Sequence, residues 1–159
     1  MKKRFVLLFI IFLFSAGGGL TAYGQLYKTG VGARVGFFNG LTVKSFMQEG
    51  RAIEGILATR WNGFILTGLY ELQRPFPDVN NLEWYAGGGA HVGFWGNGTG
   101  RYAGSTESVF GLDLILGVEY TFDEFPFSAS IDWKPAFNVV GTTGWWGDGL
   151  ALSIRYTWR

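Results

Sequence analysis

The sequence contains no cysteine, only four prolines and a single histidine among its 159 residues. The lack of cysteine excludes disulfide bonds, thiolate metal sites and cysteine nucleophiles. One histidine leaves little material for a histidine metal site. Charged residues make up 16% of the chain, against roughly 25% in an average soluble domain. The formal net charge of +1 excludes a strongly basic protein that binds nucleic acid.

Glycine and apolar side chains are abundant instead. The chain has 26 glycines, and hydrophobic residues make up 48% of it, with aromatic residues at 18%. Intrinsic disorder requires low hydrophobicity and high charge, so this composition argues against it. The glycines keep no period of three, which argues against a collagen-like chain. The length allows one domain or two very small ones.

The N-terminal segment has the order of regions that is typical of an export signal. Residues 1–4 are basic after the initiating methionine, residues 5–14 form an unbroken apolar run, and small residues stand at Ala22 and Gly24. We therefore expect a secretory signal peptide over residues 1–24, cleaved after Gly24, and a mature chain over residues 25–159. The alternative is a transmembrane helix, for which the run is shorter than the roughly 20 apolar residues required.

The mature chain alternates between apolar and polar or small residues over most of its length. This period of two is the signature of β-strands, because successive side chains of a strand point to opposite faces. Turn-forming residues such as Asn39-Gly40, Glu49-Gly50, Asn62-Gly63 and Asp123-Glu124 separate the alternating stretches. The pattern predicts eight strands, over residues 28–37, 41–48, 52–61, 64–73, 82–95, 108–122, 126–140 and 149–158.

Within these eight strands every charged residue falls in one of the two alternating phases. Many small residues share that phase, whereas the other phase carries leucine and aromatic side chains. An eight-stranded barrel has an interior just wide enough for side chains to fill, so the bulky phase would overfill it. A charge that faces lipid costs about 2–4 kcal/mol near the bilayer midplane. We therefore expect the apolar phase to face lipid, rather than a cavity as in a lipocalin-like soluble barrel.

The predicted fold is all-β, an eight-stranded antiparallel up-and-down transmembrane β-barrel over residues 25–159. Unpaired backbone groups are costly in hydrocarbon, so strands can cross a membrane only as a closed barrel. We expect a monomer in a Gram-negative outer membrane, with residues 97–107 and 141–148 forming the outer loops.

Several short motifs occur along the sequence from about Lys28 to the end. They are Gly30-x-Gly32-x-Arg34-x-Gly36, Glu54-Gly55, Trp61-Asn62-Gly63, Trp84-Tyr85-x-Gly87-x-Gly89-x-His91-x-Gly93, Gly117-x-Glu119-Tyr120, Asp132-Trp133-Lys134-Pro135 and Ile154-Arg155-Tyr156-Thr157-Trp158. With these motifs the sequence resembles small outer-membrane β-barrel proteins of the Bacteroidetes type, in the broad group of OmpX/OmpA-like eight-stranded barrels. The resemblance implies the barrel fold and an outer-membrane location, but no established activity.

The inward phase holds the main set of candidate site residues. Similar numbers of acids and bases in a narrow lumen predict paired charges, because an unpaired buried charge is costly. We expect a structural network that fills the barrel, with an ion or proton path and an acid–base site such as Glu119 with Lys134 as alternatives. The network consists of Arg34, Lys44, Glu54, Arg60, Glu71, Glu83, His91, Asp113, Glu119, Asp132, Lys134 and Arg155.

Other candidate motifs favour structural roles. His91 is in the inward phase and is expected to be a hydrogen-bonded core residue rather than a catalytic one. Residues 87–89 are three glycines without a following helix, so nucleotide binding is not expected. Residues 97–99 match a glycosylation sequon, but a match of three residues is weak evidence. Trp145 and Trp146, in an expected outer loop, are candidates for contact with something outside, or they extend the aromatic belt.

We expect a non-enzymatic protein with a structural or surface-interaction role, and no catalytic residue, metal or cofactor. The expected partners are outer-membrane lipids and, during biogenesis, the barrel-assembly machinery, with no nucleic acid. Two alternatives stay open. One is a lipid-modifying outer-membrane enzyme, and the other is an accessory subunit of a larger outer-membrane complex.

Overall fold

The computed structural model describes residues 26–60, 63–95, 107–141, 144–147 and 149–159. The predicted signal peptide, the sequon at residues 97–99 and most of the first long outer loop lie outside these residues. Within the described residues all regular secondary structure is β-strand, and none of it is a helix long and apolar enough to cross a membrane.

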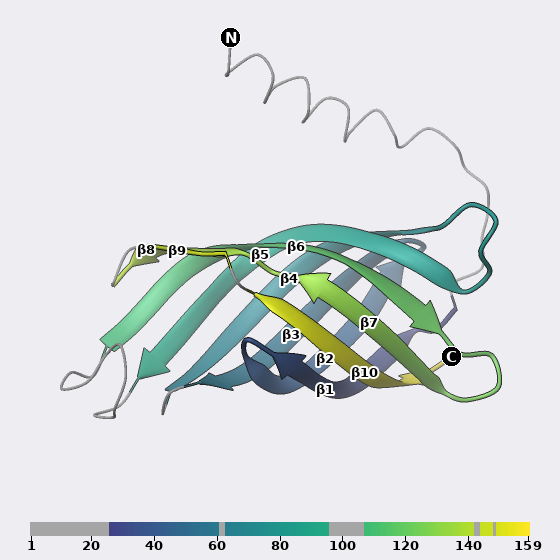
Figure 1. The fold of residues 1–159 in the computed structure, drawn as a ribbon, viewed down its shortest axis with the longest axis horizontal. Coiled ribbons are helices and arrows are strands. Elements are labelled where there is room, and N and C mark those ends of the chain that lie inside the picture. The colour runs from purple at the N-terminus through teal and green to yellow at the C-terminus, as the bar shows by residue number, and fades with distance from the viewer. Residues whose placement is uncertain (1–25, 61–62, 96–106, 142–143, 148) are drawn as a thin grey trace, which may run out of the picture.

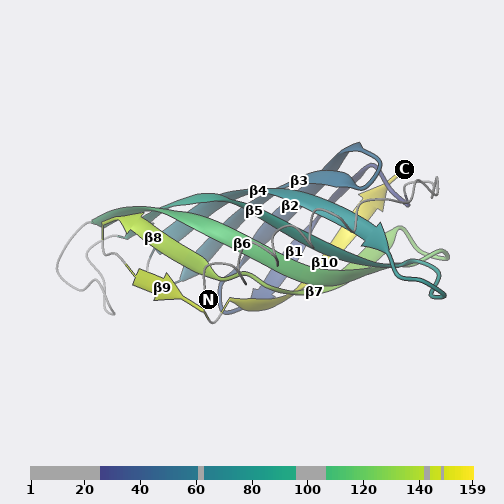
Figure 2. The same cartoon turned by 90° about the horizontal axis from the view of Figure 1, so that it is seen from above.

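The strands form a single closed antiparallel barrel (Figures 1 and 2). Each strand pairs with its neighbour, and β5 closes the sheet by pairing with β6. The segments β7 and β8 follow one another along a single strand position beside β6, and β9 and β10 do the same on the other side of β7 and β8. The barrel therefore has eight strand positions, which we call walls. The strand bounds are β1 Thr29–Gly36, β2 Asn39–Gln48, β3 Arg51–Arg60, β4 Gly63–Pro75, β5 Leu82–Trp95, β6 Glu107–Thr121, β7 Phe127–Trp133, β8 Ala136–Val140, β9 Gly144–Trp146 and β10 Leu150–Trp158.

The predicted fold class is confirmed, and the strand predicted over residues 82–95 agrees with β5 at both ends. The strand predicted over residues 126–140 is interrupted at Lys134 and Pro135. The register against β6 continues across the interruption, with Trp133 opposite Leu116 and Ala136 opposite Asp113, and it shifts only at the end of β8, where Val140 is opposite Phe110. The interruption has a local cause, because proline has no backbone N–H to donate to the ladder.

The prediction that Trp145 and Trp146 lie in an outer loop is wrong. They belong to β9, a short strand that pairs with β8 at the end of the barrel away from the C-terminus (Figures 1 and 2). Asn39-Gly40 is likewise not a turn between strands but the start of β2, which follows Phe37 and Phe38. In both places the hydrogen-bonded ladder extends further than the turn-forming residues indicated.

The walls separate apolar from charged side chains as the alternation predicts. Large apolar residues of the outward phase are about half exposed along every wall, for example Leu114 and Leu152 at 60% each. Charged residues of the inward phase are buried, for example Lys44 and Arg155 at 0%. The barrel therefore has an apolar exterior and an interior that holds most of its described strand charges.

Interior apolar side chains gather in three clusters along the barrel axis. One cluster contains Tyr27, Phe46 and Ala52, near the end where the C-terminus lies. A second cluster occupies the middle, and its buried members are Ile56, Ala58, Leu69, Tyr85 and Ile115. A third lies at the opposite end, and its buried members are Ile65, Val109, Ala136 and Trp146. Phe38 packs against both of these clusters. Apolar packing thus accompanies the polar network along the interior.

Candidate functional site: the interior polar network

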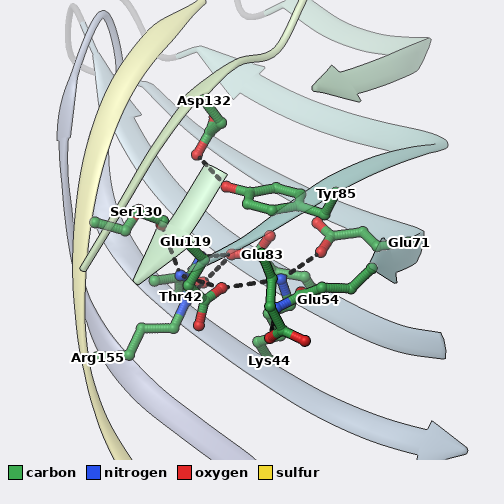
Figure 3. Close-up of polar contacts among 12 residues, drawn as sticks. Thr42, Lys44, Glu54, Glu71, Glu83, Tyr85, Glu119, Ser130, Asp132 and Arg155 are labelled. Atoms are coloured by element: carbon green, nitrogen blue, oxygen red, sulfur yellow. Dashed lines mark hydrogen bonds and ion pairs between the residues drawn. The ribbon is translucent and has the colours of Figure 1, made fainter. Parts of the chain in front are cut away.

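The centre of the interior network joins two cations to three carboxylates from different walls (Figure 3). Lys44 Nζ of β2 lies 2.8 Å from Glu71 Oε2 and 3.1 Å from Glu119 Oε2. Arg155 of β10 is paired with Glu54 and lies 3.6 Å from Glu119 Oε2. All five residues are buried, so these ion pairs between two cations and three carboxylates are shielded from water. We call these five residues the central cluster.

Hydroxyl groups bind the same charged side chains. Arg155 donates to Ser130 Oγ at 2.8 Å and to Thr42 Oγ1 at 3.3 Å, and Thr42 also donates to Glu54. The two bonds from Arg155 use donors of a guanidinium that no single carboxylate could satisfy. The central cluster therefore connects side chains from β2, β3, β4, β6 and β10 across the lumen, and Ser130 joins it to β7.

Tyr85 links the central cluster to a second ion pair. Its ring lies beneath Lys44 Nζ, 4.0 Å from the ring centroid, a distance suited to a cation–π contact. Its hydroxyl donates to Asp132 Oδ2 at 3.0 Å, and Asp132 is held by both terminal nitrogens of Arg34 (Figure 3 shows the Tyr85 contact). Such a two-point arginine–carboxylate contact restricts the orientation of both groups.

A third group surrounds His91 nearer the β8–β9 end. His91 Nδ1 lies 2.6 Å from Asp113 Oδ2, and His91 Nε2 lies 2.9 Å from Asn138 Oδ1. Lys134 donates to the other oxygen of Asp113. The ring of Trp146 stacks on that of His91, with 6.2 Å between centroids. Both ring nitrogens of His91 are thus engaged by neighbouring oxygens within the barrel.

The structure places the remaining predicted site residues as follows. Glu83 is half-buried and accepts a hydrogen bond of 2.7 Å from Gln73. The side chain of Arg60 lies outside the described residues. Glu119 and Lys134, considered above as an acid–base pair, belong to different groups, because Lys134 is paired with Asp113 and Glu119 with the central cluster. The geometry therefore gives no support to that pair.

Two inward glycines make room for the largest polar rings. Gly117 is opposite Tyr85 and Gly111 is opposite His91 in the β5–β6 ladder. A Cβ at residue 117 would lie 2.5 Å from Tyr85 Cζ, and one at residue 111 would lie 2.8 Å from His91 Nε2. Each ring therefore lies flat across the neighbouring strand, in space that any other residue would fill.

Tyr27 is a network residue that the sequence pattern did not reveal. It precedes β1, is 2% exposed, and donates a 2.5 Å hydrogen bond to Glu119 Oε1. Its ring packs edge-on against Phe46, with 5.1 Å between centroids. Inward residues of β1 have even numbers, so alternation assigns an odd-numbered residue such as Tyr27 to the outside. The chain must turn inward just before the first strand to bring it there.

One small cavity lies within the described part of the network. The cavity lined by Arg34, Phe38, Thr67, Lys134 and neighbouring residues measures about 10 Å³, which is room for about one water molecule. Among the described residues no group of three or more histidines and carboxylates has an arrangement that could hold a metal ion. The interior side chains engage one another by charge pairing and hydrogen bonding.

Comparison with solved structures supports the fold. The chain is similar to the N-terminal β-barrel domain of Pseudomonas aeruginosa OprF, with a TM-score of 0.63 and 14% sequence identity. The match covers 80% of this chain and 93% of that domain. At this identity the likeness establishes a shared barrel architecture and no more. No protein-family model matches the sequence, and no curated protein matches it.

Proposed function

We propose that this protein is a non-enzymatic, integral outer-membrane barrel whose lumen is filled by its own side chains, with a structural or surface-interaction role. The observation that carries the proposal is the separation of charge from apolar surface. Large apolar side chains cover the outside while the charges of the central cluster are buried within. A water-soluble barrel would have the opposite arrangement, since a broad apolar exterior is unstable in water.

The filled lumen is supported by the contacts that cross it. Arg155, Lys44 and Tyr85 are fully buried and reach side chains of other walls. Eight-stranded barrels leave space for side chains but not for a wide aqueous channel. The described cavity of about 10 Å³ agrees with such packing.

The orientation follows from the usual asymmetry of bacterial outer-membrane barrels, which have short periplasmic turns and longer outer loops. The longest connection, residues 96–106 between β5 and β6, is at the end opposite the start of β1 and the end of β10, whereas their own end has the two-residue turn Glu49-Gly50. We assign this end to the periplasm. Gly50 has φ of 67°, a conformation that glycine adopts without strain.

Planar-bilayer recording tests the filled lumen. We expect the wild-type protein to give no large steady conductance. The variant K44A/E119A/R155A, which removes long side chains from the lumen, is the positive control and should conduct. If the wild-type protein conducts as steadily as this variant, the lumen is open and the proposal is wrong.

The surface-interaction role rests on the outer rim. Trp145 is 59% exposed and faces outward from β9 beside Phe137, whereas Trp146 faces inward. This placement favours a belt at the membrane interface for Trp145, where amphipathic rings are enriched. A pull-down from native membranes in mild detergent, comparing wild type with Trp145→Ala, tests for a protein partner. Loss of a captured protein in the variant would support the interaction role, and identical capture would refute a role for Trp145.

A further inference from the structure

Two arginines are exceptions to the apolar exterior. Arg51 begins β3 and Arg74 lies one residue before the end of β4, and both are exposed in the outward phase. Arg51 is opposite Leu72, two residues from Arg74, so the two arginines are diagonal neighbours on one face. Cα atoms in such a relation are about 7–8 Å apart.

The side chain of Arg74 brings its charge towards Arg51. Its Nη1 donates to the backbone oxygen of Gln73 at 3.1 Å and lies against Gly50, in the space that a Cβ would fill. Gly50 immediately precedes Arg51. Within the described residues neither arginine forms an ion pair, although Glu49 is exposed in the same turn. The pair therefore presents two uncompensated guanidinium groups at the periplasmic rim.

A shallow apolar depression lies on the same face, further into the membrane. Its volume is about 600 Å³, and its outward lining includes Val43, Ile53, Gly55, Gly68, Tyr70 and Gly88. Gly55 and Gly68 are directly opposite each other, and no atom lies within 4 Å of a Cβ built on either. Glycines on adjacent strands thus hollow the wall where large side chains would otherwise stand.

The distance from the arginines to the depression matches the length of a lipid. Gly55 is four residues from Arg51, about 13 Å along the strand, and Gly68 is six residues from Arg74, about 20 Å. Half of the hydrocarbon thickness is about 15 Å. A phosphate bound at the arginine pair would therefore place an acyl chain over Ile53 and Tyr70 and into the hollow.

We propose that Arg51, Arg74 and the depression around Gly55 and Gly68 form a binding site for one anionic glycerophospholipid of the periplasmic leaflet. The guanidinium groups bind the phosphate, for which arginine provides planar, two-point hydrogen bonding. The hollow receives one acyl chain. The inference rests on the proposed membrane location, because only a barrel in a bilayer presents this face to lipid.

Native mass spectrometry of the purified barrel in detergent, titrated with phosphatidylglycerol or phosphatidylcholine, tests the site. Each arginine near an anionic headgroup contributes a factor of about five in affinity. We therefore expect the variant R51Q/R74Q to bind phosphatidylglycerol about thirtyfold more weakly and to lose its preference over phosphatidylcholine. Glu49→Gln should bind phosphatidylglycerol more tightly, because it removes a nearby negative charge.

A second variant tests the hollow. Gly68→Leu fills it without a steric clash, and we expect several-fold weaker binding of both lipids. Arg159→Gln and Val118→Leu are matched controls, since Arg159 is an exposed cation away from β3 and β4 and Val118 borders a different outward depression. Equal affinity of R51Q/R74Q and wild type would overturn the site, as would an equal loss in Arg159→Gln. If the wild-type protein is a dimer, and Gly68→Leu makes it monomeric without weakening lipid binding, the hollow is the contact site for a second copy instead.

Vesicle insertion separates this inference from the proposed function. If the wild-type barrel fails to insert into vesicles, the membrane location is wrong and the lipid site falls with it. If it inserts but binds both lipids equally in all variants, only the lipid site is refuted.

Discussion

Arg155 offers the sharpest test of the interior network, because it is buried and bonded to several partners at once. Its guanidinium is paired with Glu54, lies near Glu119, and donates to Ser130 and Thr42. Arg155→Met keeps much of the side-chain length but removes the charge and every donor. Removing one partner of a buried ion pair costs about 3–5 kcal/mol, because the other charge stays buried without compensation. We expect the free energy of unfolding to fall by about this amount.

Guanidinium-induced unfolding of the barrel in lipid vesicles, followed by tryptophan fluorescence, measures the effect. The variant Glu54→Gln and the double variant complete a double-mutant cycle, in which we expect a coupling of roughly 1–3 kcal/mol between the two residues. Arg159→Gln, at an exposed position, is the control and should change stability by less than about 0.5 kcal/mol. A loss below about 1 kcal/mol for Arg155→Met, or additive effects in the cycle, would refute the reasoning.

Three further substitutions test other parts of the barrel, with the same unfolding measurement. Gly117→Val places a side chain against the Tyr85 ring and should destabilise the barrel by about 1–3 kcal/mol. Gly55→Val places its side chain in open space and should not destabilise the barrel. Equal effects of the two variants would contradict the conclusion that Gly117 makes room for Tyr85. Leu114→Arg puts a charge on the apolar exterior and should cost about 2–4 kcal/mol in vesicles, so a neutral result would argue against lipid contact. Tyr27→Phe removes a hydrogen bond to a carboxylate and should cost about 1.5–3 kcal/mol; an unchanged midpoint would show that Tyr27 does not hold this position.

Much of the architecture could be predicted because strand alternation is a local property. Residues such as Lys44 and Leu114 are assigned to opposite faces by parity and composition alone, and the structure agrees. The pairing of Gly117 with Tyr85 is less local. The sequence indicated that small residues share the inward phase with the charges, but only the register of β5 against β6 places Gly117 opposite Tyr85.

The placement of Trp146 could not be predicted because the parity of the chain changes between β9 and β10. Trp146 extends the wall of β10, whose inward residues have odd numbers, yet it faces inward with an even number. The register against the neighbouring wall shifts by one residue between β9 and β10, with Trp146 opposite Ala136 and Leu150 opposite Trp133. An inserted residue of this kind reverses the phase of all that follows. No local signal marks the shift, so alternation could not have assigned Trp146.

The identity of the ion pairs was equally beyond the sequence, because parity gives the face of a residue but not its height or its neighbours across the lumen. Lys44 and Glu119 are 75 residues apart in the chain and meet only because the barrel closes.

The closure of the barrel also constrains its function. If the interior groups bind one another, they are not free to bind a ligand, and the chemistry left for recognition is on the outer wall and the rims. Arg51 and Arg74 are the described strand cations that face outward, and a charge there is favourable only beside headgroups. The same separation of charge that supports our proposal of a filled lumen therefore leaves the rim with Arg51 and Arg74 as the place where we propose that this barrel binds lipid.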